Sequence, residues 1–126
     1  LNVQRMVREL VAMGARGVLL EDQVWPKRCG HMRGKEVVPA EEHAAKIRAA
    51  VDARGEASFV ITARTDALET HGIDEAIRRA KLYKEAGATL LFVEGPRTVE
   101  ELRRIGSELP PPLVVNLIDA RNQISN

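Results

Sequence analysis

The chain has 126 residues, of which 44% are hydrophobic, 29% charged and 3% aromatic, values typical of a soluble globular chain and unlike those of disordered or fibrous proteins. Its formal net charge is +1. Positively and negatively charged residues alternate along the sequence, which argues against a nucleic-acid partner because phosphate binding requires concentrated positive charge. The apolar runs are far shorter than the roughly 20 residues of a membrane span. A single cysteine excludes an internal disulfide, and no secretory signal pattern opens the chain, so a cytoplasmic location is expected.

The first part of the chain predicts a helix and then a buried strand. Gly14 suits the end of a helix near Met13, and the apolar residues before it recur three and four positions apart: Val3, Met6, Val7, Leu10 and Val11. Residues 17–20 are continuously apolar and favour a strand buried on both faces of a parallel sheet. Polar residues follow immediately at 21–23. Charge is therefore expected at the carboxyl end of this strand.

Residues 23–39 predict a long irregular loop, because proline and glycine recur in it among basic residues. Loops of this length are usually functional. A strand-and-helix unit then repeats along the chain, with Thr98 and Glu101 forming a capping box at one helix start, while His71 and Gly72 suit a turn. The predicted strands cover 58–63, 89–93 and 113–115, and the predicted helices cover 39–53, 73–83 and 98–109.

Alternating strands and helices predict the α/β class with a parallel sheet and right-handed crossovers. No glycine-rich phosphate turn follows any strand, which favours a (β/α)8 barrel over an open doubly wound sheet. A barrel of this type needs about 250 residues, so residues 1–126 are expected to form a single fragment of a barrel domain, with four of its strands. Uncovered strand edges predict association into a homo-oligomer.

Polar residues follow each predicted strand and are expected to meet at one edge of the sheet. These residues are Glu21, Arg64, Glu94 and Asn116. Two carboxylates suit a hard cation such as Mg²⁺, and a planar guanidinium suits a carboxylate substrate. Taken singly, each residue is also explained as a turn former, a helix cap or part of a structural ion pair.

Cys29 lies between basic residues and Gly30, a setting that favours the thiolate and lets a ligand approach the backbone. The alternative is an inert cysteine that only packs. His31 suits substrate orientation or proton transfer and also suits a surface position. His43 is interpreted as a surface residue of a helix, because Glu41 and Glu42 precede it.

Five motifs follow one another along the chain: Glu-Asp-Gln at 21–23, Pro-Lys-Arg-Cys-Gly-His at 26–31, Ala-Arg-Thr-Asp-Ala at 63–67, Glu-Ala-Gly-Ala at 85–88 and Phe-Val-Glu at 92–94. By their order and spacing the chain resembles the isocitrate lyase/phosphoenolpyruvate mutase superfamily over about residues 1–118, and within it the methylisocitrate lyase and dimethylmalate lyase branch. The resemblance implies a Mg²⁺-dependent (β/α)8 enzyme. Such an enzyme cleaves a carbon–carbon bond of a 2-hydroxy di- or tricarboxylate into a 2-oxo acid and a second carboxylate.

The resemblance also implies a role for each matched residue. Cys29 is the acid that protonates the leaving group, Lys27 tunes that cysteine, and Glu21 holds a metal-bound water. The residues implied to contact the carboxylates and hydroxyl of the substrate are Gly30, His31, Arg64, Glu94 and Asn116.

The family's Asp pair that ligates Mg²⁺ directly is expected upstream of Leu1, so the chain is read as a fragment that binds the metal weakly alone. Two alternatives stay open. One is a catalytically inactive fragment that binds a partner or oligomerises. The other is a phosphonopyruvate-type mutase or an oxaloacetate decarboxylase, although the cysteine in the motif argues against each of these two activities.

Overall fold

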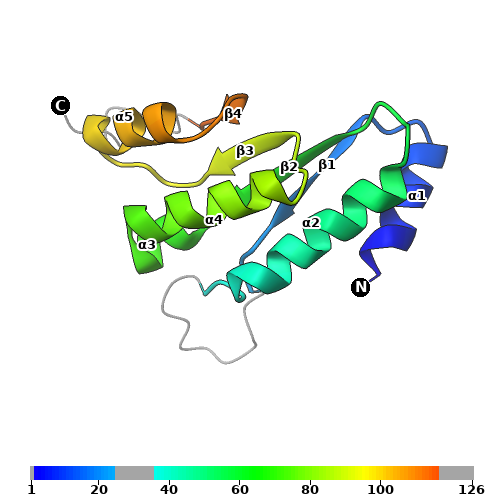
Figure 1. Ribbon diagram of the computed structural model, residues 1–126, viewed down its shortest axis with the longest axis horizontal. Helices are drawn as coiled ribbons and strands as arrows, with labels where there is room; N and C mark the ends of the chain where they lie inside the picture. The colour runs from blue at the N-terminus through cyan, green and yellow to red at the C-terminus, as the bar shows by residue number, and fades with distance from the viewer. Residues whose placement is uncertain (1, 25–35, 117–126) are drawn as a thin grey trace.

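The computed structural model describes residues 2–24 and 36–116, and Figure 1 shows helices packed along a twisted sheet. The helices are α1 (Val3–Ala12), α2 (Ala40–Arg54), α3 (Ala67–His71), α4 (Ile73–Glu85) and α5 (Val99–Glu108). The strands are β1 (Gly17–Glu21), β2 (Val60–Thr65), β3 (Leu90–Val93) and β4 (Leu113–Val114).

The four strands form one parallel sheet in the order β1-β2-β3-β4. Strand order therefore follows chain order, with no reversal of the kind that defines a doubly wound sheet. The predicted α/β class and the arrangement of part of a (β/α)8 barrel are confirmed. The register sets Glu21 beside Arg64, and Arg64 beside Phe92, so the ends of three strands lie at one edge.

The core lies between the helices and one face of the sheet. Alternate residues of a strand point to opposite faces, and in β2 the buried residues Ile61, Ala63 and Thr65 belong to the helix-covered face. The other face carries apolar side chains that remain open, with Leu19 45% and Val60 37% exposed. This is the face that points inward in a closed barrel.

Side-chain caps and a glycine turn mark the ends of helices, and of these caps the one at Thr98 was predicted from the sequence. The side chain of Asn2 caps α1 by accepting from the backbone N–H of Arg5 at 3.0 Å, and Thr98 caps α5 by accepting from the N–H of Glu101 at 3.0 Å. After α4, Gly87 adopts a φ of 112°, and a Cβ there would lie 2.8 Å from a methyl group of Val51. A glycine is therefore required where the chain turns from α4 into β3.

Two local expectations differ from the structure. Of the two residues predicted to form a turn, His71 is the last residue of the short helix α3, and the turn lies at Gly72, whose φ is 91°. The predicted irregular loop over 23–39 is partly paired: Gln23 and Val37 form an antiparallel bridge. Its two described ends therefore lie side by side.

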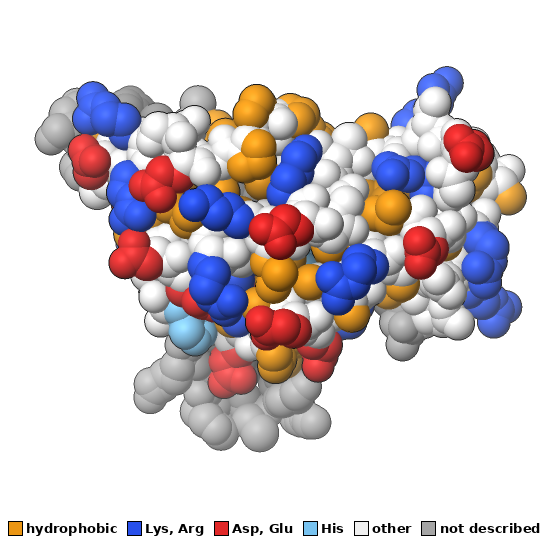
Figure 2. Space-filling view, viewed as in Figure 1, with side chains coloured by type: hydrophobic (Ala, Val, Ile, Leu, Met, Phe, Trp, Pro, Cys, Tyr) orange, Lys and Arg blue, Asp and Glu red, His pale blue; other side chains and the backbone are white. Residues whose placement is uncertain are grey.

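Lys and Arg side chains alternate with Asp and Glu side chains on the face drawn in Figure 2. Charged side chains of the described residues form ion pairs within and between helices, for example Arg104 with Asp74 at 2.9 Å and with Glu108 at 2.7 Å. Within residues 2–24 and 36–116, no helix is long and apolar enough to cross a membrane.

Candidate active site

Arg64 is the centre of a polar cluster at the carboxyl end of the sheet. Its Nε lies 3.4 Å from Oε2 of Glu21, and its Nη2 lies 3.6 Å from Oε1 of Glu94. Asn116 joins the cluster because its Nδ2 donates to the same Oε1 of Glu94 at 3.1 Å. The structure thus brings together four residues that the sequence placed at successive strand ends.

Asp66 is a fifth member, which belongs to the motif at 63–67 and for which no role was predicted. It directly follows β2, and its carboxylate accepts from Nη2 of Arg64 at 2.8 Å and from Nε at 3.2 and 3.3 Å. This is the two-point pairing that fixes a guanidinium plane in one orientation. Asp66 is buried, whereas the side chain of Arg64 is 23% exposed. The forked guanidinium group of Arg64 is therefore held from its buried side and remains partly open to solvent.

The surroundings keep Arg64 charged. Burial alone lowers its pKa, but the hydrogen bond and charge of Asp66, with the charges of Glu94 and Glu21, outweigh burial and raise the pKa above its ordinary value. The guanidinium also lies 5.3 Å from the ring centre of Phe92 on β3, a distance that allows a cation–π contact. A permanent cation is therefore held at the edge of the open face.

Three carboxylates surround this guanidinium within 4 Å. An anionic ligand that approaches Arg64 therefore also approaches an excess of negative charge, which an additional cation would neutralise. Carboxylate oxygens are the ligands that Mg²⁺ prefers. Nevertheless, the described residues include no group of three His, Cys, Asp or Glu side chains that could hold a metal ion. A complete ligand set for such an ion is therefore not present in the described part of the chain.

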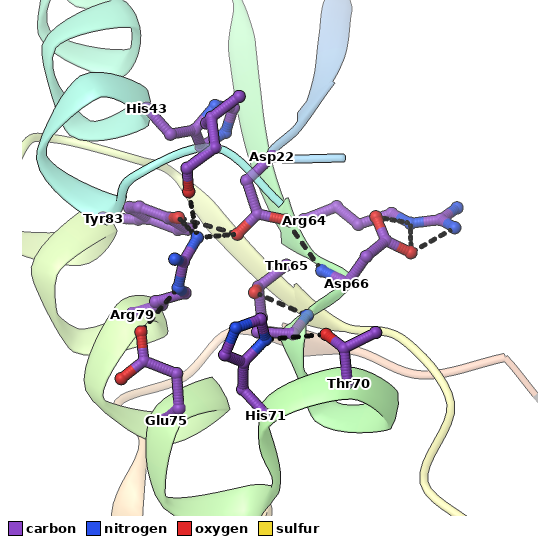
Figure 3. Close-up of polar contacts among 12 residues, drawn as sticks. Asp22, His43, Arg64, Thr65, Asp66, Thr70, His71, Glu75, Arg79 and Tyr83 are labelled. Atoms are coloured by element: carbon purple, nitrogen blue, oxygen red, sulfur yellow. Dashed lines mark hydrogen bonds and ion pairs between the residues drawn. The ribbon is translucent and has the colours of Figure 1, made fainter. Parts of the chain in front are cut away.

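A buried polar network lies behind the cluster, between β1 and α4 (Figure 3). The carboxylate of Asp22, which is fully buried, accepts from Oη of Tyr83 at 2.7 Å and from Nη1 of Arg79 at 3.2 Å. Burial, together with the charge of Asp22, raises the pKa of Tyr83, so its phenol stays neutral and donates. Arg79 continues to Glu75, whose Oε2 accepts from Nε at 2.7 Å.

This network was not predicted from the sequence. The sequence feature that points to the network is a charged residue on the apolar side of a helix. Arg79 lies three positions after Ala76 and four before Tyr83, and both of these residues are buried on α4. A buried charge at such a position needs a partner of opposite sign. That requirement points to an acidic residue in the core, and Asp22 after β1 satisfies it.

The interpretation of His43 as a surface residue is wrong. His43 is 1% exposed and lies on the side of α2 that also carries Ala40, Ala44 and Ile47. Burial lowers its pKa, and the neutral ring donates from Nε2 to the carbonyl of Leu20 at 3.3 Å. Its Nδ1 has no hydrogen-bond partner among the described residues. The ring packs edge-on against Tyr83 at a centroid distance of 4.8 Å.

The other predicted site residues lie outside the described residues. They are the members of the basic and cysteine-containing motif: Lys27, Cys29, Gly30 and His31. The structure does show where the flanking chain lies, since the N–H of Val24 donates to the carbonyl of Glu36 at 2.7 Å. The N–H of Asp22 also donates to the carbonyl of Arg64 at 3.2 Å, so the chain leaves β1 beside the Arg64 cluster.

A parallel sheet in sequential order, with polar side chains gathered at its carboxyl edge, defines part of a (β/α)8 barrel with its site at the usual end. The chain belongs to the phosphoenolpyruvate phosphomutase family, whose family model matches residues 1–126. This agrees with the predicted superfamily.

Two curated relatives show how far this membership extends. The chain is 59% identical over 119 residues to the petal death protein of Dianthus caryophyllus, covering 94% of this chain and 37% of that protein. It is 50% identical over 118 residues to 2,3-dimethylmalate lyase of Eubacterium barkeri, covering 94% of this chain and 41% of the enzyme. The chain therefore spans well under half the length of these relatives.

Solved structures share the fold. Oxaloacetate acetylhydrolase in complex with 3,3-difluorooxalacetate matches with a TM-score of 0.83 at 37% identity, covering 98% of this chain and 42% of that one. Phosphonopyruvate hydrolase in complex with oxalate and Mg²⁺ matches with a TM-score of 0.76 at 32% identity, covering 97% of this chain and 47% of that one. Both structures are complexes with a small dicarboxylate, and the second also contains Mg²⁺.

Proposed function

We propose that the protein containing this chain is a Mg²⁺-dependent lyase that cleaves a carbon–carbon bond of a 2-hydroxy di- or tricarboxylate. The products are a 2-oxo acid and a second carboxylate. The observation that carries the proposal is the convergence of Glu21, Arg64, Glu94 and Asn116 at one edge of the sheet. The 50% identity to a 2,3-dimethylmalate lyase supports the same reaction class.

Arg64 is the residue that binds a substrate carboxylate. Its fork is permanently charged, is held in one plane by Asp66 and is partly exposed on the open face. A planar guanidinium pairs with a carboxylate through two parallel hydrogen bonds, which fixes the orientation of the ligand as well as its position. Glu94 and Asn116 complete the polar surface beside it and can contact the substrate hydroxyl and carboxylate.

The reaction needs charge stabilisation at the oxygen that becomes a carbonyl. Mg²⁺ supplies this as a Lewis acid when bound, and the excess of carboxylates around Arg64 favours a cation at this edge. Glu21 is the described residue that we expect to contact water around the ion. Its side chain is 32% exposed and lies at the end of β1, so it can reach the open face.

The leaving group needs a proton donor. As the carbon–carbon bond breaks, the 2-hydroxyl group gives its proton to a base and its oxygen becomes the carbonyl oxygen, while the electron pair of the broken bond moves into the departing carboxylate, whose carbon an acid must protonate. We assign this role to Cys29, with Lys27 nearby to tune the thiol, and we assign substrate carboxylate contacts to Gly30 and His31. These assignments rest on the sequence motif.

The test uses the purified full-length gene product, including any residues that flank this chain. It is incubated with 2,3-dimethylmalate, 2-methylisocitrate, oxaloacetate or phosphonopyruvate, with Mg²⁺ or with EDTA, and 2-oxo acid release is followed by trapping with phenylhydrazine. Residual oxaloacetate and phosphonopyruvate are quantified separately by NMR, because both react with the trap themselves. We expect Mg²⁺-dependent cleavage of at least one 2-hydroxy acid.

Two variants separate the roles. Arg64→Lys keeps the charge but removes the fork, so we expect a large rise in KM. Arg78→Lys is the control, because Arg78 is an exposed arginine of α4 that lies away from the cluster. Turnover of phosphonopyruvate or oxaloacetate without cleavage of a 2-hydroxy acid would contradict the lyase proposal and favour another reaction of this family. No turnover at all would favour the inactive alternative.

A further inference from the structure

The carboxylate of Asp22 connects the interior of the protein to the candidate site. Its Oδ1 accepts from the backbone N–H of Asp66 at 2.8 Å. Its Oδ2 accepts from Oη of Tyr83 at 2.7 Å and from Nη1 of Arg79 at 3.2 Å. Three donors from two separate elements, the end of β2 and helix α4, thus converge on one buried side chain. Figure 3 shows Asp22 between Tyr83 and Arg79 on one side and Asp66 on the other.

Stability alone does not account for this arrangement. A buried ion pair loses hydration on folding, and well-packed apolar residues of similar volume often stabilise a protein as much or more. What the pair provides is a fixed geometry, because the donors hold the Asp22 carboxylate from two sides, Tyr83 and Arg79 at Oδ2 and the N–H of Asp66 at Oδ1. The bond to the N–H of Asp66 fixes the main chain of the residue whose carboxylate holds the Arg64 fork.

We propose that Asp22 is a positioning residue for Arg64. Tyr83 and Arg79 hold the Asp22 carboxylate from α4, Asp22 holds the backbone of Asp66, and the Asp66 carboxylate holds the guanidinium of Arg64 in the orientation that receives a substrate carboxylate. This inference rests on the carboxylate-binding role proposed for Arg64. It predicts that removing the donor of Tyr83 or of Arg79, the two α4 residues that hold Asp22, alters ligand affinity through Arg64 alone.

Only a carboxylate satisfies all three donors. An amide at position 22 offers a single acceptor oxygen, and its NH₂ group would face either the N–H of Asp66 or the donors of Arg79 and Tyr83. Asp22→Asn therefore breaks the chain of contacts at one end or the other. Tyr83→Phe is the milder variant, because it removes the short hydrogen bond to Asp22 and the longer one that Tyr83 accepts from Arg79 at 3.5 Å, and leaves the ring, which packs on His43, in place.

The test is a double-mutant cycle on the full-length gene product, with oxalate as the probe in the presence of Mg²⁺. Calorimetry gives the oxalate Kd for wild type, Tyr83→Phe, Arg64→Lys and the double variant. If Tyr83 acts through Arg64, Tyr83→Phe weakens oxalate binding about tenfold in the wild type and less than about twofold in the Arg64→Lys background. Equal fold-changes in the two backgrounds would overturn the proposal.

Ile77→Val is the matched control. Ile77 is buried on the same helix, is 4% exposed, and loses a methyl group at a cost to stability similar to that of one hydrogen bond, about 1 kcal/mol in either case. We expect it to leave the oxalate Kd within about twofold. An effect as large as that of Tyr83→Phe would show that general loosening of α4, rather than positioning, is responsible.

A readout without any ligand separates this inference from the proposed function. The Nε–H signal of Arg64 in a ¹H–¹⁵N spectrum, assigned by its loss in Arg64→Lys, reports how firmly Asp66 holds the guanidinium. We expect its exchange with water to accelerate in Tyr83→Phe and Asp22→Asn and to stay unchanged in Ile77→Val. If the wild type neither binds oxalate nor cleaves a substrate, the proposed function is wrong. If the exchange of the Arg64 signal is the same in wild type, Tyr83→Phe and Asp22→Asn, the positioning role is wrong.

Discussion

Removing the positive charge of Arg79 should destabilise the protein far more than removing its neighbour Arg78. Arg79 is 5% exposed and donates to the carboxylate of Asp22 at 3.2 Å, the carbonyl of Val38 at 2.7 Å and the carboxylate of Glu75 at 2.7 Å. Arg79→Met leaves Asp22 as a buried charge without its cation. Breaking a buried pair in this way costs about 3–5 kcal/mol, a large part of the 5–15 kcal/mol of a typical domain.

The assay is urea unfolding of the full-length gene product followed by circular dichroism. Arg78→Met is the control: Arg78 pairs with Glu75 and Glu41 on the surface, and its side chain is 53% exposed. Exposed pairs of this kind contribute about 1 kcal/mol or less. The two variants should therefore differ by at least about 2 kcal/mol.

A second substitution tests the cause. In the double variant Asp22→Asn with Arg79→Met, the amide oxygen can accept from the N–H of Asp66 and the amide NH₂ can donate to Oη of Tyr83, so no charge is left unpaired. We expect the double variant to be more stable than Arg79→Met alone by about 1–3 kcal/mol. Additive losses, or an Arg79→Met variant no weaker than Arg78→Met, would refute the reasoning.

Three further predictions concern individual carboxylates and the cysteine. Cys29→Ser should lower kcat far more than it raises KM, because a hydroxyl is a poorer proton donor; near-normal turnover would reject the acid role. Glu21→Ala should raise the Mg²⁺ concentration needed for half-maximal activity, and an unchanged value would exclude it from the metal site. Hydrogen bonds from Arg78 and Arg79 lower the pKa of Glu75 to about 2. The unfolded chain then binds the additional proton, so stability should fall as pH drops from about 5 to 2, and Glu75→Gln should flatten that part of the curve.

The strand ends were predictable because their positions follow from local pattern and a general rule. Each predicted strand is a short apolar run that ends in a polar residue, and parallel strands place their carboxyl ends at one edge. The pattern and this rule together were sufficient to predict that four residues lie close to one another: Glu21, Arg64, Glu94 and Asn116. The measured contacts of Arg64 with Glu21 and Glu94, and of Asn116 with Glu94, confirm this proximity.

The buried network of Asp22, Arg79 and Tyr83 was not predictable in the same way. Asp22 and Arg79 are 57 residues apart, and their pairing depends on which turn of α4 faces the end of β1. His43 was misplaced for a related reason, because its acidic neighbours suggested a surface. Helical spacing puts it three residues after Ala40 and four before Ile47, on the buried side. Position on the helix, rather than the neighbours in sequence, decided its environment.

Glu21 and Asp22 are adjacent at the end of β1, and they make contacts on opposite faces of the sheet at the same candidate site. Because successive strand residues point to opposite faces, Glu21 reaches the Arg64 cluster on the open face while Asp22 turns toward the helices and meets Tyr83 and Arg79. A register slip of one residue would exchange them. It would bury Glu21 against α4 and expose the carboxylate that holds Asp66. The pairing of β1 with β2 therefore determines the candidate site as strictly as it determines the core.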